Sequence, residues 1–97
     1  MQQSKVIDPW KIEEVRRYLA RRFPAARFED YPRGGGTAYL FVVTASGIGQ
    51  RQKRHNLVVT RQFFDRFPEQ SSFKNALESG DVARSMERAG ERSIELY

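Results

Sequence analysis

The chain has 97 residues, no cysteine and a single histidine, and its formal net charge is +5. This length predicts one domain spanning residues 1–97, because two ordinary domains need a longer chain. The lack of cysteine excludes disulfides and thiolate metal sites, and one histidine is too few for a typical zinc site. Binding of a metal by carboxylates alone stays open, and we expect no cofactor.

The sequence also lacks the features of a secreted or membrane protein. Its first residues are polar and lead quickly to Asp8 and Pro9, so the apolar core of a signal peptide is missing. No window approaches the ~18 consecutive apolar residues that a membrane span needs. We therefore expect a cytoplasmic protein that does not contact a membrane.

A helix is predicted over residues 9–23. Asp8 can accept a hydrogen bond at the N-cap, and Pro9 has no backbone N–H that would go unused in the first turn. Apolar residues then recur on one stripe until Pro24 ends the helix. The lead-in, residues 1–7, is expected to be flexible.

Three strands are predicted next. Residues 26–31 alternate between polar and apolar, and residues 32–36 form a break of proline, arginine and three glycines. The centre of residues 37–45 is continuously apolar, which indicates a central strand covered on both faces, or on one face and part of the other. Residues 46–49 supply a turn, and residues 55–59 form the returning strand.

The last third of the chain is predicted to hold two or three short helices and a closing strand. Side chains that can cap these helices occur in chain order at Thr60, at Ser71 or Ser72, and at Asp81. The first short helix spans residues 61–67, and Gly80 can end the second. Residues 93–97 alternate again and indicate an edge strand.

These elements follow the order α-β-β-β-α-α-β, with a third short helix before the last strand as the other option. Strands grouped in mid-chain with helices on either side favour an α+β domain. We expect its sheet to be antiparallel and to be covered on one face by the helices.

Positive charge is concentrated in the first two thirds of the chain. Residues 1–62 hold 12 Lys and Arg against 5 Asp and Glu, a net charge of +7. Residues 63–97 hold 5 against 7, a net charge of −2. This asymmetry favours a cationic face that attracts a polyanion.

The run from Gln50 to His55 joins two strand-like segments and carries much of this charge. We expect a cationic hairpin that binds nucleic acid or another polyanion, because Lys and Arg contacts to phosphates supply most non-specific affinity. An exposed Tyr39 or Phe28 can stack on unpaired bases. The alternative is that these charges only keep a small protein soluble. The predicted contact residues are Arg51, Lys53, Arg54 and His55 of the hairpin and Arg16, Arg17 and Arg21 of the first helix, with Arg22 and Arg27 as further candidates.

A protein-interaction module is the second hypothesis. Three phenylalanines, Phe63, Phe64 and Phe67, fit the core of a small domain, and Phe64 is the one expected to stay partly outside as a contact for a partner. The edge strand that ends in Leu96 and Tyr97 can pair with a second chain. The partner would be another protein or a second copy of this chain, and the oligomeric state stays open. An acidic protein is the alternative to nucleic acid as the ligand of the cationic hairpin.

An enzymatic role is the third hypothesis and the least favoured. His55 is a candidate general base, but no orienting acid and no nucleophile can be assigned beside it. The glycine segments 34–36 and 47–49 lack the residues that complete a phosphate-binding loop, so they indicate turns. We expect a non-enzymatic protein and assign no catalytic residue.

One stretch resembles a known family. The strand residues 42–44, then Gly49, then an Arg-His pair at 54–55 are similar to a run in BolA-like proteins, which are small α+β domains linked to transcription and iron-sulfur partners. The chain departs from that family at Asn56, which stands in place of a second arginine, and it diverges after Val59. Because of these departures no ligand residue is carried over.

Overall fold

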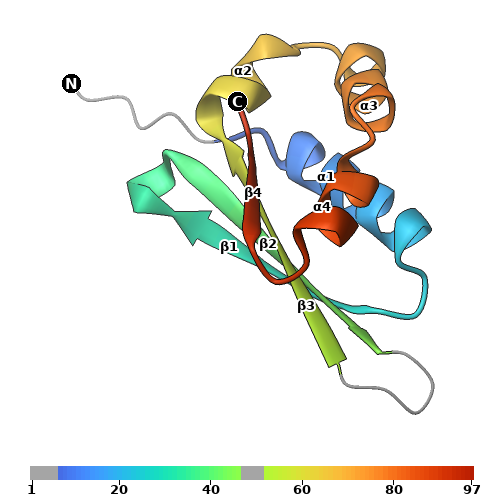
Figure 1. The fold of residues 1–97 in the computed structure, drawn as a ribbon. Helices are drawn as coiled ribbons and strands as arrows, with labels where there is room; N and C mark the ends of the chain where they lie inside the picture. Colours follow the sequence, from blue (N-terminus) through green and yellow to red (C-terminus); the bar gives the residue numbers. More distant parts are fainter. Residues whose placement is uncertain (1–6, 47–51) are drawn as a thin grey trace.

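The computed structural model describes residues 7–46 and 52–97, which form four α-helices, four strands and one short 3₁₀ turn (Figure 1). The elements in chain order are α1 (Pro9–Arg22), β1 (Arg27–Arg33), η1 (Gly34–Gly36), β2 (Ala38–Ser46), β3 (Gln52–Thr60), α2 (Arg61–Arg66), α3 (Gln70–Ser79), α4 (Val82–Ala89) and β4 (Ser93–Leu96). The predicted α+β class is confirmed, and the third short helix is present before the last strand.

The strands form one sheet in the order β1-β2-β3-β4. The first three strands pair antiparallel, as expected, but β4 runs parallel to β3, with Asn56 opposite Ser93 and Val59 opposite Leu96. The sheet is therefore mixed. The helices α2, α3 and α4 lie between β3 and β4 in the chain, and a connection of this length allows the parallel pairing that a tight turn does not.

The hairpin of β2 and β3 extends further toward its turn than the sequence predicts. β3 begins at Gln52 instead of His55, so Lys53 and Arg54 lie in a strand and pair with Ala45 and Thr44. Alternate strand residues point to opposite faces of a sheet. This early start therefore sends the side chains of Lys53 and Arg54 to different sides of the molecule.

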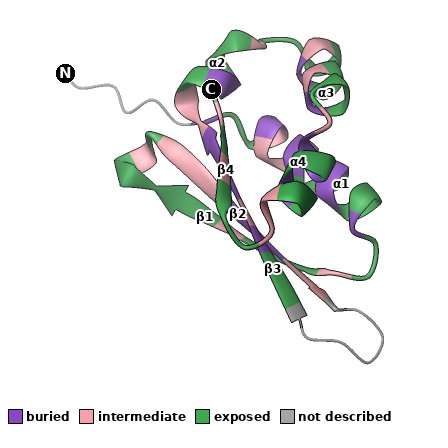
Figure 2. Cartoon of the chain, in the orientation of Figure 1, coloured by how far each residue is buried: buried purple, intermediate pink, exposed green. Residues whose placement is uncertain are grey.

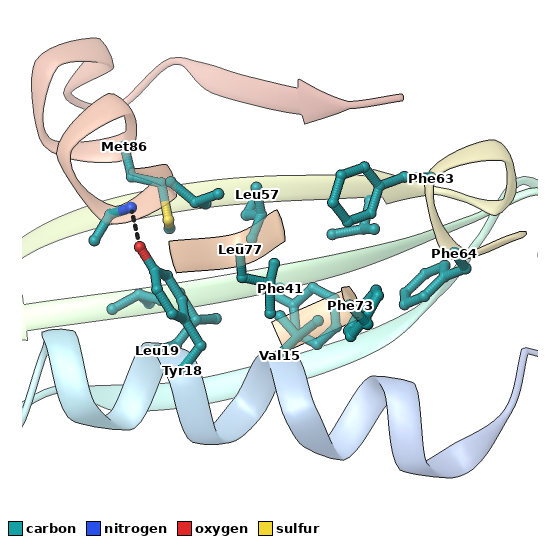
Figure 3. Close-up of a cluster of buried hydrophobic side chains, with 14 of the residues drawn as sticks. Val15, Tyr18, Leu19, Phe41, Leu57, Phe63, Phe64, Phe73, Leu77 and Met86 are labelled. Carbon is teal, nitrogen blue, oxygen red and sulfur yellow. Dashed lines mark hydrogen bonds between the residues drawn. The ribbon is translucent and has the colours of Figure 1, made fainter. Parts of the chain in front are cut away.

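The core lies between the sheet and the helices, which pack on one face of the sheet (Figures 1 and 2). Alternate residues of the two central strands supply its floor, and they are Phe41, Val43, Leu57 and Val59. Helix α1 adds Val15 and Leu19, and α3 adds Phe73 and Leu77 (Figure 3). Ile7 is also buried in this core, so the expected flexible lead-in does not include it; residues 1–6 lie outside the described part.

The aromatic cluster at α2 and α3 corrects one prediction. Phe64 is only 1% exposed, and its ring stacks on Phe73 with centroids 5.8 Å apart. Phe63 and Phe67 contact the same ring of Phe73 from other directions. Phe64 is therefore a core residue and is not available to a partner, because Phe73 of α3 packs on the ring that was expected to stay partly outside.

Of the four predicted side-chain caps, one forms its hydrogen bond. Asp8 directly precedes α1 as predicted, but its side chain makes no cap bond. The Thr60 side chain accepts a hydrogen bond from the Phe63 backbone N–H, as predicted. Helix α3 begins at Gln70, so Ser71 and Ser72 lie inside it and do not cap it. Asp81 precedes α4 but has left-handed backbone angles and makes no side-chain cap bond.

A backbone N–H in the first turn of α4 finds its hydrogen-bond acceptor on another helix. The hydroxyl of Tyr18 on α1 is buried and accepts a hydrogen bond of 3.0 Å from the backbone N–H of Ala83 (Figure 3). A buried N–H without a partner costs roughly 1–3 kcal/mol, so this bond fixes α4 against α1. Residues 90–92 then connect α4 to β4, which is an edge strand of the sheet.

Candidate nucleic-acid interface

The sheet has a second face, turned away from the helices, which we call the open face. Residues that pair directly across strands share a face. Since Phe41 and Val43 point into the core, their neighbours in sequence point to the open face. The open face consists of Arg27, Glu29, Tyr31 and Arg33 of β1, Ala38, Leu40, Val42 and Thr44 of β2, Arg54, Asn56, Val58 and Thr60 of β3, and Ser93 and Glu95 of β4.

Two arginines flank one threonine on this face. Thr44 pairs with Arg27 on one side and with Arg54 on the other, so the three side chains form a row across β1, β2 and β3. Both arginines are exposed, and neither has a carboxylate within ion-pair distance among residues 7–46 and 52–97. Their charge is therefore available to a ligand.

A cavity of about 410 Å³ adjoins this row. Its lining residues are Thr44, Arg54, Asn56 and Glu91. The guanidinium and the amide can donate hydrogen bonds, and the carboxylate and the amide oxygen can accept them. Thr44 and Arg54 belong both to the cavity and to the row, so a ligand held by the row also lies close to Asn56 and Glu91.

His55 does not belong to this surface. Its side chain is 5% exposed, its Nδ1 lies 3.0 Å from the carbonyl oxygen of Gly90, and its ring packs against Phe23 with centroids 5.6 Å apart. These contacts join the end of α1 and the end of α4 to β3. The histidine predicted to contact phosphate is therefore a structural residue, and its partner is a carbonyl and not the acid that a general base needs.

The other predicted contact residues of the hairpin do not lie together on one face. Lys53 is exposed on the same side as His55, whereas Arg54 lies on the open face. Gln50 and Arg51 lie outside the described residues. Of the predicted hairpin contacts, Arg54 is thus the one that the structure places on the open face, and the role of Arg51 stays a prediction.

The predicted arginines of α1 are already paired with carboxylates. Arg16 makes two hydrogen bonds to Asp30, of 2.8 and 2.7 Å, and a third contact to Glu13. Arg17 lies 3.9 Å from Glu13, and Arg21 lies 3.3 Å from Glu78. Helix α1 packs on the face of the sheet that carries Phe41 and Val43 (Figure 1), whereas the strand register places Arg54 on the other face. The structure therefore does not bring Arg16, Arg17 and Arg21 to the open face, and their charge is partly neutralised.

The interaction between Arg16 and Asp30 shifts the pKa values of both side chains. The hydrogen bond from Arg16 holds the pKa of Asp30 below its usual value, although partial burial acts in the other direction. The same bond raises the pKa of Arg16. The hydroxyl of Tyr39 also donates to Asp30, at 3.3 Å, and burial with this neighbouring carboxylate raises the pKa of Tyr39.

We expect Asp30→Asn to lower the free energy of unfolding by about 1 kcal/mol at pH 7, because the charged partner of Arg16 is lost. A depressed carboxyl pKa stabilises the fold above the unfolded value, and this stability is lost as the pH falls through the folded value. The difference between the two proteins should therefore shrink below pH ~4. Urea unfolding at pH 7 and pH 3 measures it, and an equal difference at both pH values contradicts the assignment.

The aromatic residue on the open face is not one of those predicted. Tyr39 points toward the helices, where its ring packs on Phe41 with centroids 5.2 Å apart. Phe28 is 38% exposed but pairs with Val43, so it also lies on the helix side. Tyr31 is 45% exposed and lies on the open face. The alternation of residues 26–31 separates Tyr31 from Phe28, but it does not tell which of the two faces the core.

The predicted protein-interaction residues have different environments. Leu96 is partly buried and packs against the core, whereas Tyr97 is 58% exposed at the end of the chain described here. β4 is an edge strand, as expected. Because Phe64 is buried, it is no longer a candidate contact. A protein contact through this edge therefore depends on Tyr97 and the outer backbone of β4, and it stays a prediction.

In the part of the chain that the structure describes, no helix has the length and apolar composition to cross a membrane. Within the same residues, no three His, Asp or Glu side chains gather in a way that could hold a metal ion. Comparison of the chain with protein-family models, curated proteins and solved structures finds no match.

Proposed function

We propose that this domain binds nucleic acid through the open face of its sheet and performs no catalysis. The observation that carries the proposal is the row of Arg27, Thr44 and Arg54, in which both arginines are exposed and have no ion-pair partner in the described residues. Arginine is the side chain best suited to phosphate, because its guanidinium can donate two parallel hydrogen bonds.

The geometry of the row suits a backbone that crosses several strands. Neighbouring strands lie about 4.8 Å apart, so the backbones of Arg27 and Arg54, two strands apart, are separated by about 10 Å. Two long side chains that start at this separation can reach different phosphates of one strand of nucleic acid. Thr44 between them offers a hydroxyl that can donate to the same backbone.

The helix arginines are not part of this proposal. Binding by Arg16 would have to compete with its two hydrogen bonds to Asp30, and the exposed ion pairs of Arg17 and Arg21 also reduce their net attraction for phosphate. Of the seven contact residues predicted from the sequence, Arg54 is the one that lies on the open face among the described residues. Arg27, a further candidate, lies in the same row. Lys53 can add attraction from the other face of the sheet, and Arg51, which lies outside the described residues, stays a predicted contact.

Fluorescence anisotropy with labelled oligonucleotides tests the proposal. We expect binding at about 50 mM salt that weakens strongly by about 200 mM, because phosphate contacts release condensed counterions. Three or four contacts to a single strand give a slope of about −2 to −3 in a plot of log K against log salt. Absence of binding to any oligonucleotide at the lower salt concentration contradicts the proposal.

A further inference from the structure

The open face has a pattern of charge along its length. The row of Arg27 and Arg54 lies at the hairpin end, and Arg33 lies at the other end of β1. Between them, Glu29 and Tyr31 follow each other on the same face of β1. The distance from Arg27 to Arg33 along the strand is about 20 Å, since each residue advances it by about 3.4 Å. Positive charge therefore stands at both ends of a segment that has an aromatic ring in its middle.

Tyr31 is the residue of this face best placed to contact a base. It pairs with Leu40, which in turn pairs with Val58, so its neighbours across the sheet are apolar. Val42 and Val58 are buried, whereas Tyr31 is 45% exposed. The ring of Tyr31, and not the valines, thus offers apolar surface to a ligand.

The carboxylate of Glu29 favours one placement of a nucleic-acid strand on this face. The hydroxyl of Tyr31 donates to Glu29 at 3.3 Å, which ties the end of the tyrosine side chain to its own strand. A negative group beside the ring repels phosphate, whereas Arg27 and Arg54 attract it. A nucleic-acid strand on this face therefore gains most when its phosphates lie near the arginines and a base, which is uncharged, lies at Tyr31.

We propose that the ligand is single-stranded nucleic acid, with one unpaired base stacked on Tyr31 and the flanking phosphates held by Arg27, Arg54 and Arg33. This inference rests on the proposed function and names its substrate class. In a duplex the bases are paired and stacked on one another, so their faces are closed to a side chain. A single strand exposes them, and stacking on an aromatic side chain contributes about 1–3 kcal/mol per base.

The experiment compares a labelled single strand with a hairpin duplex of the same composition at low salt. We expect the single strand to bind more tightly. Tyr31→Ala should weaken its binding about 5- to 100-fold, whereas Tyr31→Phe, which keeps the ring and loses only the hydroxyl, should stay close to the original protein. The salt slope should be the same in all three proteins, because Tyr31 contacts no phosphate.

Phe28→Ala is the matched control, since Phe28 is an exposed aromatic of the same strand on the opposite face. It should leave binding unchanged. Equal affinity for single strand and duplex, with no effect of Tyr31→Ala, would overturn the stacking site while leaving phosphate binding by the arginines intact. Failure of every oligonucleotide to bind would overturn both proposals. Circular dichroism of each variant confirms that the loss comes from the site and not from unfolding.

Discussion

Phe73→Ala should lower the free energy of unfolding by about 3–5 kcal/mol, because it removes a fully buried ring from the centre of the core. This ring contacts four other aromatic rings, whose centroids lie 5.8 to 6.4 Å away, and they are Trp10, Phe63, Phe64 and Phe67. The partners come from α1, α2 and the residue after α2. Alanine would leave a cavity where three segments meet.

Such a loss is large beside the total stability of a small domain, about 5–15 kcal/mol. Urea unfolding followed by the fluorescence of Trp10 measures it directly, because this indole packs edge-on against Phe73 at 5.9 Å. Phe28→Ala serves as the comparison, since Phe28 is 38% exposed and makes none of these ring contacts. A loss below about 1 kcal/mol for Phe73→Ala would show that α3 does not pack on the sheet as described.

The second large effect concerns ligand affinity. A protein that carries both Arg27→Gln and Arg54→Gln should bind a single-stranded oligonucleotide at least about tenfold more weakly at low salt, because two phosphate contacts are lost. Its stability should change little, since both side chains are exposed and neither forms an ion pair in the described residues. Anisotropy titration gives the affinity, and thermal unfolding gives the stability.

A charge-matched variant separates local contact from overall attraction. The double substitution Arg17→Gln, Arg84→Gln also removes two positive charges, from exposed side chains whose ion pairs, at 3.9 and 3.8 Å, are weak. Both residues lie on helices. If net charge alone attracts nucleic acid, the two double variants will lose affinity equally. If the open face binds it, the helix variant will retain most of the affinity.

Local signals in the sequence predicted most of the fold. Pro9 and Pro24 mark the limits of α1, and the Thr60 cap starts α2, because these effects depend on a few neighbouring residues. The parallel pairing of β4 was not predictable in the same way. It depends on how three helices pack over the sheet and return the chain beside β3, and no short pattern in residues 93–97 carries that information.

The site was predictable in part. Arg54 and Arg27 were among the candidates because positive charge is visible in the sequence. The arginines of α1 were misleading since the partners of Arg16 and Arg21 lie 14 and 57 residues further along the chain. Tyr31 and Asn56 were not among the site candidates, because the face that each occupies is fixed by the register of the sheet.

His55 illustrates the same limit. As the only histidine it attracts a functional assignment, but its role is decided by Phe23 and Gly90, which the fold brings to it from two other elements. A histidine buried at such a junction holds the end of α4 near β3 and so helps to place β4 at the edge of the sheet.

The most direct test of the open face as a nucleic-acid site is the salt dependence of single-strand binding by the Arg27→Gln, Arg54→Gln protein. Each phosphate contact to a single strand contributes about 0.7 to the slope of log K against log salt, so two lost contacts should make it shallower by about 1.4. The charge-matched helix variant should keep the slope of the original protein. An unchanged slope in the Arg27→Gln, Arg54→Gln protein would contradict the account, because it would mean that these arginines contact no phosphate.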